Sequence, residues 1–188
     1  MRRWLCRTGW CLGALVAALV LWLGWLHTSG NFHPVIDGEV YRSAQMSPAD
    51  LSRWQAEYGI RSVLNLRGEN ADAPWYRDEI EAARALGLTH ADFRMSARRS
   101  IDSAEATHLV RLMRDLPKPL LIHCASGADR TGLASALYVA ALAKGGEEAA
   151  EWQLSPRYGH LGIPVLSQAW PMDQSWEVLE PWLGYSDS

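Results

Sequence analysis

The sequence predicts an α/β fold in which a mixed sheet, parallel at its centre, is flanked by helices and preceded by one N-terminal transmembrane helix. Short apolar runs at 60–66 and 119–122 alternate with helical patterns, as in sheets whose strands are joined by helices. An uncharged run at 10–26 follows three arginines and predicts the transmembrane helix. We therefore expect a signal anchor at 1–30 and a single folded domain at 31–188.

The uncharged run comprises 17 residues, which is the short limit for a helix that crosses a bilayer. Arg2, Arg3 and Arg7 precede it, so the positive-inside rule keeps the N-terminus in the cytoplasm. No small-residue cleavage pattern follows, which favours an uncleaved anchor over a removed signal peptide. A buried core helix is disfavoured because the run has no polar face. In a bacterium we expect a single-pass inner-membrane protein whose folded domain lies on the periplasmic side.

The first half of the folded domain is predicted to alternate strands and helices. An extended stretch at 32–42 leads to Ser47, which stands before Pro48 at a typical helix start. Strand, helix and strand are then predicted at 60–66, 75–86 and 88–95. The last of these strands alternates apolar and polar residues, which is typical of a strand with one polar face.

The second half is expected to be mostly helical, apart from one central strand. Asp102 and Glu105 form a capping-box pattern that starts a helix ending near Asp115. Pro117 and Pro119 end this helix before the strand. Further helices are predicted at 133–144 and 147–154. We expect the tryptophan-rich C-terminal segment to cover the core.

The strongest functional signal is the loop between the strand at 119–122 and the helix after it. Backbone N–H groups from Ala125 to Arg130 lie where a helix begins, so several lack an intrahelical acceptor and can converge on an anion. Arg130 can grip two phosphate oxygens in a planar fork. The same positive field favours the thiolate form of Cys124, which would make it a nucleophile.

The residues of this loop carry a family resemblance. His123 and Cys124, five further residues, and then Arg130, Thr131 and Gly132 match the HCx5R(S/T)G signature. The chain therefore resembles the cysteine-dependent protein tyrosine and dual-specificity phosphatases. The stretch at 40–45 also looks like the opening of many small bacterial and fungal dual-specificity phosphatases.

The resemblance implies a role for each residue of the loop. Cys124 attacks phosphorus to form a phosphocysteine, Arg130 binds the phosphoryl group, and the Thr131 hydroxyl helps the thiolate to leave. It also implies that 31–188 is a phosphatase domain that needs no metal or other cofactor. The phosphate-binding residues that it implies are Ala125, Ser126, Gly127, Ala128, Asp129 and Arg130.

The general acid is the point at which the sequence departs from the family. Dual-specificity phosphatases place an aspartate roughly twenty to thirty residues before the cysteine, where it protonates the leaving oxygen. The most direct register puts Arg98 or Arg99 there, and arginine cannot act as the acid. Asp102 lies in the right loop and is our assignment, although a helix cap explains it equally well. Asp92 and Asp129 remain alternatives, with loop orientation as the main role of Asp129.

Several basic and acidic residues could lie at the rim of the site. Arg98 and Arg99 could recognise a second anionic group on the substrate, or they could form a solvated basic turn. The loop after the strand at 60–66 is expected at the carboxyl edge of the sheet, where ligands collect. The remaining rim candidates are Arg67 and Glu69, which a solvated loop explains equally well, and Arg157 and His160, for which the sequence favours surface packing.

Charge and cysteine content exclude two classes of protein. The formal net charge is −3, and the 31–188 part is more acidic because three arginines precede it, so the chain lacks the basic footprint of a nucleic-acid-binding protein. Cys6 and Cys11 also precede this part, which leaves Cys124 as its single cysteine. A disulfide framework within 31–188 is therefore impossible.

We expect hydrolysis of a phosphomonoester through a phosphocysteine, with phosphotyrosine in proteins as the default substrate. A phospholipid or sugar-phosphate headgroup is the alternative, because the predicted anchor would hold the enzyme beside the membrane. A phosphate-binding pseudophosphatase is a further alternative, since the acid is missing from its usual place. Sulfur transfer by a rhodanese-like loop is disfavoured because Arg130, Thr131 and Gly132 open a helix.

Overall fold

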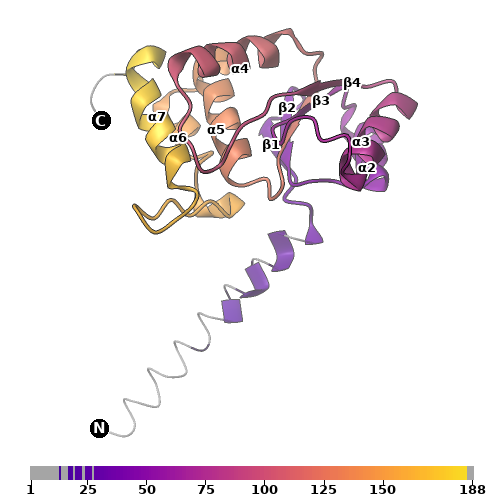
Figure 1. Cartoon of the computed structure of the whole chain (residues 1–188), viewed down its shortest axis with the longest axis horizontal. Helices are drawn as coiled ribbons and strands as arrows, with labels where there is room; N and C mark the ends of the chain where they lie inside the picture. The colour runs from indigo at the N-terminus through magenta and orange to yellow at the C-terminus, as the bar shows by residue number, and fades with distance from the viewer. Residues whose placement is uncertain (1–12, 14–16, 19, 23, 27, 186–188) are drawn as a thin grey trace, which may run out of the picture.

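A five-stranded sheet with the order β1-β2-β5-β3-β4 lies at the centre of the computed structural model, which describes residues 13, 17–18, 20–22, 24–26 and 28–185 (Figure 1). The strands β2, β5, β3 and β4 are parallel, and β1 at the edge is antiparallel to β2. The mixed, centrally parallel sheet expected from the sequence is therefore confirmed. The strands are β1 (His33–Ile36), β2 (Val40–Ser43), β3 (Ser62–Asn65), β4 (Thr89–Asp92) and β5 (Leu120–His123).

Helices cover both faces of the sheet because alternate strand residues point to opposite sides. One core contains Tyr41, Val63 and Leu121, and the other contains Val40, Leu64, Leu120 and Ile122. The first core is closed by α2 (Pro48–Tyr58) and α3 (Pro74–Ala85). The second is closed by α4 (Ser103–Asp115), α5 (Asp129–Tyr138) and α7 (Trp170–Leu183). Figure 1 shows the two groups of helices on opposite sides of the sheet.

Two helices begin at the caps that the sequence predicts. In α2 the Ser47 hydroxyl accepts from the Asp50 amide at 3.2 Å, with Pro48 at the first helical position. In α4 the Asp102 carboxylate accepts from the Glu105 amide at 2.8 Å, and the Glu105 side chain accepts from the Asp102 amide. Both are capping boxes, each of which satisfies amide groups that the helix itself cannot.

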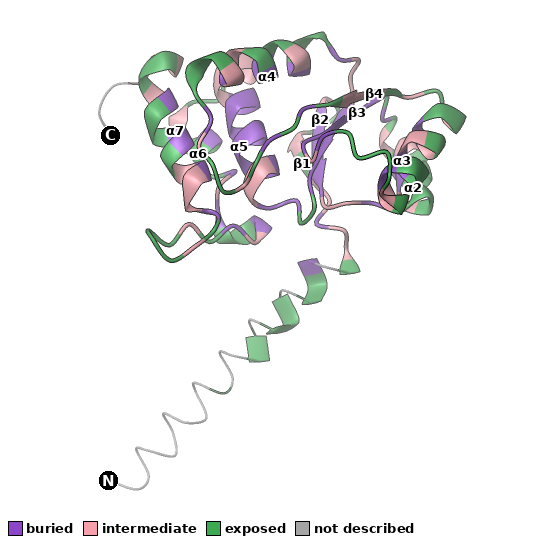
Figure 2. Ribbon diagram, in the orientation of Figure 1, coloured by how far each residue is buried: buried purple, intermediate pink, exposed green. Residues whose placement is uncertain are grey.

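The helix after β5 differs in extent from the predicted 133–144. It begins four residues earlier, at Asp129, so the last residues of the signature loop form its first turn. Its residues from Thr131 to Tyr138 are all buried (Figure 2). The chain then continues as a π-helix over Val139–Ala143. The next helix, α6 (Glu147–Glu151), is shorter than the predicted 147–154, and a 3₁₀ turn, Pro156–Tyr158, follows it.

The predicted N-terminal transmembrane helix is corrected by the structure. Within the residues that the structure describes, no helix combines the length and the apolar character that crossing a membrane requires. As a helix, the run at 10–26 would cover about 26 Å, less than the hydrocarbon core of about 30 Å. Part of that run, and all three N-terminal arginines, lie outside the described residues. The periplasmic location and the boundary at residue 31 stay predictions.

Candidate active site

The loop from Cys124 to Ala128 leaves the carboxyl end of β5 and enters α5, at the edge of a parallel sheet where ligands bind in such folds. Cys124 is buried, and it is the free cysteine of the described part of the chain. The side chains of Ala125 and Ser126 are exposed. The loop thus joins the thiol to the N-terminus of α5, where amide groups without an intrahelical acceptor can bind an anion.

Gly127 gives the loop its turn. Its φ of +73° is in the left-handed region, and a Cβ placed there would lie 2.6 Å from backbone atoms of Ser43 and Ala44. Real Cβ contacts are essentially never this short, so the loop can pack against the end of β2 only with glycine at this position.

A buried arginine holds the loop from behind. Arg42 in β2 is fully buried, and its Nη2 donates to the carbonyl oxygens of Gly127 at 2.9 Å and Ala128 at 3.2 Å. Its Nη1 donates to the backbone and side-chain oxygens of Gln153 at 2.8 and 3.0 Å. The guanidinium stacks 3.8 Å from the Tyr158 ring centroid. Burial lowers the pKa of Arg42 to about 10, so it is a cation at neutral pH.

The carbonyl groups of Ala125 and Ser126 are also anchored. The Asn31 side-chain amide donates to the carbonyl oxygen of Ser126 at 2.9 Å, and the Gln45 backbone amide donates to that of Ala125 at 3.2 Å. All four carbonyl groups from 125 to 128 thus receive hydrogen bonds from surrounding residues. The Ala128 amide lies 3.4 Å from the Ser126 hydroxyl oxygen, which accepts from it. Loop amides whose carbonyl groups are fixed in this way can serve as preorganised donors to an anion.

Arg130 and Thr131 stand in the first turn of α5. The Arg130 Nη1 donates to the carbonyl oxygen of Met95 at 3.3 Å and lies 3.5 Å from that of Leu66. These carbonyl groups follow β4 and β3, so the guanidinium extends across the carboxyl edge of the sheet. Thr131 is buried, and its hydroxyl makes no hydrogen bond within the described residues.

A family model described as "Tyrosine phosphatase family" matches residues 23–158, which is well over half of the chain. The chain belongs to the tyrosine phosphatase family. It is a cysteine-based phosphatase, as the loop signature indicates. No curated protein matches the chain.

Solved structures of this phosphatase class share the fold. TpbA from P. aeruginosa is 20% identical, with a TM-score of 0.60 over 80% of this chain and 85% of TpbA. The core catalytic domain of the PP-IP phosphatase Siw14 from S. cerevisiae is 21% identical, with a TM-score of 0.59 over 80% and 91%. PTPMT1 is 14% identical, with a TM-score of 0.53 over 81% and 98%. At these identities the likeness establishes the fold alone.

Two of the three general-acid candidates of the phosphatase are held by local structure. Asp102 is exposed and caps α4. Asp92 ends β4, where its carboxylate accepts from the Asn65 amide at 2.8 Å and from the Tyr76 hydroxyl at 2.6 Å. Both carboxylates therefore have a structural role, Asp102 as a helix cap and Asp92 as a link from β4 to β3 and α3.

The third candidate, Asp129, is paired with a histidine. Its carboxylate lies 2.8 Å from Nδ1 of His160, whose Nε2 lies 3.0 Å from the carboxylate of Asp173 in α7. Burial by itself lowers the pKa of His160, but hydrogen bonds to Asp129 and Asp173 raise it to about 9. His160 is therefore a cation at neutral pH and joins the loop to α7. The sequence placed His160 only at the rim.

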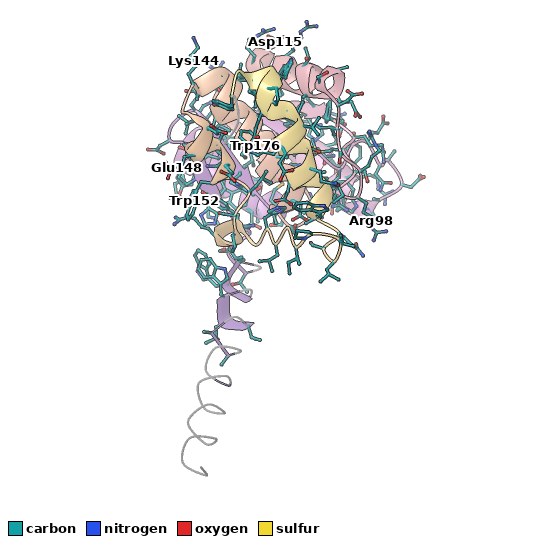
Figure 3. All side chains as sticks on the ribbon, turned by 90° about the vertical axis from the view of Figure 1, so that its left-hand side faces the viewer. Arg98, Asp115, Lys144, Glu148, Trp152 and Trp176 are labelled. Carbon is teal, nitrogen blue, oxygen red and sulfur yellow. The ribbon has the colours of Figure 1, made fainter. Side chains whose placement is uncertain are left out.

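Of the predicted rim residues, Arg98 and Arg99 contact other surface side chains, whereas Arg67 interacts with the catalytic loop. Arg98 donates to the Gln168 side chain at 3.1 Å and projects from the surface in Figure 3, and Arg99 pairs with Glu105. Arg67 lies close enough to Arg130 and Cys124 to interact with both electrostatically. Burial and Arg130 lower the pKa of Arg67, and its guanidinium stacks 3.4 Å from the Trp75 ring centroid. The other predicted rim residues, Glu69 and Arg157, are exposed.

Proposed function

We propose that Cys124 is the nucleophile of a two-step phosphomonoester hydrolysis. In the first step a bond forms between its sulfur and phosphorus, the bond from phosphorus to the leaving oxygen breaks, and a protein acid gives that oxygen a proton. In the second step water attacks phosphorus, which releases inorganic phosphate and the thiolate. Arg130 binds the equatorial oxygens in both steps, and Thr131 donates to the departing sulfur.

One observation carries this assignment. The four loop carbonyl groups from 125 to 128 are bound by Arg42, Asn31 and Gln45, which fixes the peptide units of the loop that follows the thiol. Preorganised N–H donors stabilise a phosphoryl group whose charge is spread over three equatorial oxygens. A cysteine buried for packing alone would not need such anchoring.

For the substrate we propose a phosphotyrosine side chain in a protein. The family supports this, and TpbA, which shares the fold, has been crystallised with phosphotyrosine. Trp75 and the Arg67 guanidinium stacked on it supply an aromatic ring and a cation near Cys124 and Arg130. Arg98 and Arg99 are engaged by Gln168 and Glu105, which favours this substrate over a polyphosphorylated headgroup.

The test is phosphate release by the full chain in reductant and chelator. Substrates are an activated aryl phosphate, phosphotyrosine and phosphoserine peptides, and a dispersed phospholipid monoester. We expect turnover of the aryl phosphate and the phosphotyrosine peptide, and its loss in Cys124→Ser. Cys11→Ser is the matched control and should retain wild-type rates. Activity surviving in Cys124→Ser would refute the mechanism, and a preference for the lipid over both peptides would refute the substrate assignment.

A further inference from the structure

A buried carboxylate lies behind the catalytic loop and is not used in the mechanism above. Glu79 of α3 is 2% exposed. Its Oε1 accepts from Nε2 of His123 at 3.0 Å and from Nε2 of His90 at 2.7 Å, and its Oε2 accepts from the Gln45 side chain at 2.5 Å. A buried acid in the middle of a helix needs such partners, because an unpaired buried charge is very costly.

Two of these partners act on the chain next to the nucleophile. His123 is the last residue of β5 and directly precedes Cys124. Gln45 holds Ala125, which directly follows Cys124, through its backbone amide. Glu79 therefore fixes the residues that anchor the chain on both sides of the thiol, although it lies 45 positions before Cys124 in the sequence.

The same cluster reaches the rim of the site. The Gln45 side-chain oxygen accepts from Nη1 of Arg67 at 2.6 Å, so Gln45 links Glu79 to the cation beside Trp75. An amide has one oxygen and one nitrogen, and Gln45 uses the oxygen for Arg67 and the nitrogen for Glu79. The orientation of this amide is therefore determined by the two charges that it joins.

The ring of His123 depends on Glu79 for its orientation. A carboxylate has no proton to give, so Nε2 of His123 must carry the hydrogen. The other ring nitrogen of His123, Nδ1, makes no hydrogen bond within the described part of the chain. Glu79 is thus the polar contact that sets the direction of this ring.

The charge of Glu79 is stable at neutral pH. Burial alone would raise the pKa of Glu79, but the charge of His123 and the hydrogen bonds from His123, His90 and Gln45 hold it well below its usual range. The other ionisable groups around the cluster are Arg67, Tyr76 and Asp92.

We propose that Glu79 is a positioning residue for the phosphatase reaction, which holds Cys124 and its loop through His123 and Gln45. This inference rests on the proposed role of Cys124 as the nucleophile. It assigns Glu79 no contact with the substrate. Replacing the carboxylate should therefore lower kcat and change the behaviour of the thiol, with little effect on KM for a small substrate.

The experiment compares Glu79→Gln with the wild-type full chain. We expect kcat for the aryl phosphate to fall on the order of 10- to 100-fold, because small displacements of a nucleophile have effects of this size. The second readout is iodoacetamide alkylation against pH, followed on the peptide that contains Cys124. The alkylation curve should differ from that of the wild type, because an amide does not hold the His123 ring and Gln45 as the carboxylate does, and the residues on both sides of the thiol then change position. Glu81→Gln, an exposed carboxylate on the same helix, is the matched control.

Glu79→Asp keeps the charge but shortens the side chain by one methylene, which moves the carboxylate away from its partners. It replaces Glu79→Gln in the experiment if that variant does not fold. It should show the same changes at smaller size. Wild-type kcat and a wild-type alkylation curve in a folded Glu79 variant would overturn the inference. Absence of turnover in the wild-type chain would instead refute the proposed function, while the alkylation comparison would still decide the role of Glu79.

Discussion

The Nη2 atom of Arg42 and the carbonyl oxygen of Gly127 lie 2.9 Å apart, although 85 positions separate the two residues in the sequence. This contact ties the second strand of the sheet to the phosphate loop. It also gives a buried cation its partners, since Arg42 binds carbonyl oxygens and a side-chain amide in place of a carboxylate. The stability of the domain and the shape of the loop are therefore linked through one side chain.

Replacing Arg42 by Met should destabilise the domain and abolish phosphate binding. The substitution leaves the oxygens of Gly127, Ala128 and Gln153 without their donor, at a cost on the order of 3 kcal/mol in the free energy of unfolding. Urea denaturation measures the stability, and vanadate inhibition measures the site. Arg53→Met, at a side chain that is 60% exposed, is the control and should change stability by less than about 0.5 kcal/mol. Wild-type vanadate affinity in Arg42→Met would contradict the conclusion that Arg42 holds the phosphate loop in its binding conformation.

Gly127→Ala should remove activity even if the protein still folds. Its Cβ would meet the backbone of Ser43 and Ala44, so the loop must move away from β2. We expect kcat/KM to fall on the order of 100-fold, as displaced catalytic groups do. Gly38→Ala is a matched control, because Gly38 has the same φ of +73° with nothing within 4 Å of its added Cβ. Equal losses in both variants would show that backbone strain, rather than the contact, is responsible.

The ion pairs of His160 should make stability fall at alkaline pH. The folded pKa of His160, about 9, lies above its ordinary value of 6.5. Its contribution is therefore fully present below pH 6.5 and is lost as pH rises through 9, with a size on the order of 2 kcal/mol. Denaturant unfolding between pH 6 and 10 measures this slope. His160→Gln should be less stable at pH 6 and should flatten that slope, and an unchanged slope would exclude His160 as its source.

Asp102→Asn separates capping from catalysis. Asparagine caps helices about as well as aspartate, so thermal stability should change little. If Asp102 donates the proton, the variant should lose far more activity on a phosphotyrosine peptide than on an aryl phosphate with a good leaving group, by on the order of 100-fold. Asp129→Asn is measured alongside. Equal rates of wild type and Asp102→Asn on the peptide would remove Asp102 from the reaction.

The parts of the fold that depend on neighbouring residues could be predicted from the sequence. The strand before Cys124, the helix after it and the caps at Ser47 and Asp102 are set by apolar runs, capping residues and prolines that lie within a few positions of one another. The transmembrane helix was predicted from the same kind of local pattern, but the run at 10–26 is short for a bilayer, and apolar character alone does not determine where a segment resides.

The supporting residues of the site could not be predicted, because their roles depend on distant contacts. Arg42 lies in a strand and Glu79 in an amphipathic helix, where a charged residue is usually solvated. Nothing near either residue in the sequence indicates that it is buried. Asn31 and Gln45 likewise obtain their roles from loop carbonyl groups about 80 to 95 positions away, which only the parallel pairing of β2 with β5 brings close.

The anchored carbonyl groups of the loop have a consequence for specificity. A flexible loop would lose conformational entropy when it closed around an anion, and part of the binding energy would be spent on that ordering. Here Arg42, Asn31 and Gln45 have already fixed the peptide planes, so the ordering cost was met during folding. The interaction energy of the phosphoryl group is then available to lower the barrier. The loop then binds the phosphoryl group of any substrate in the same way. Discrimination between substrates depends on the leaving group and on the rest of the substrate molecule.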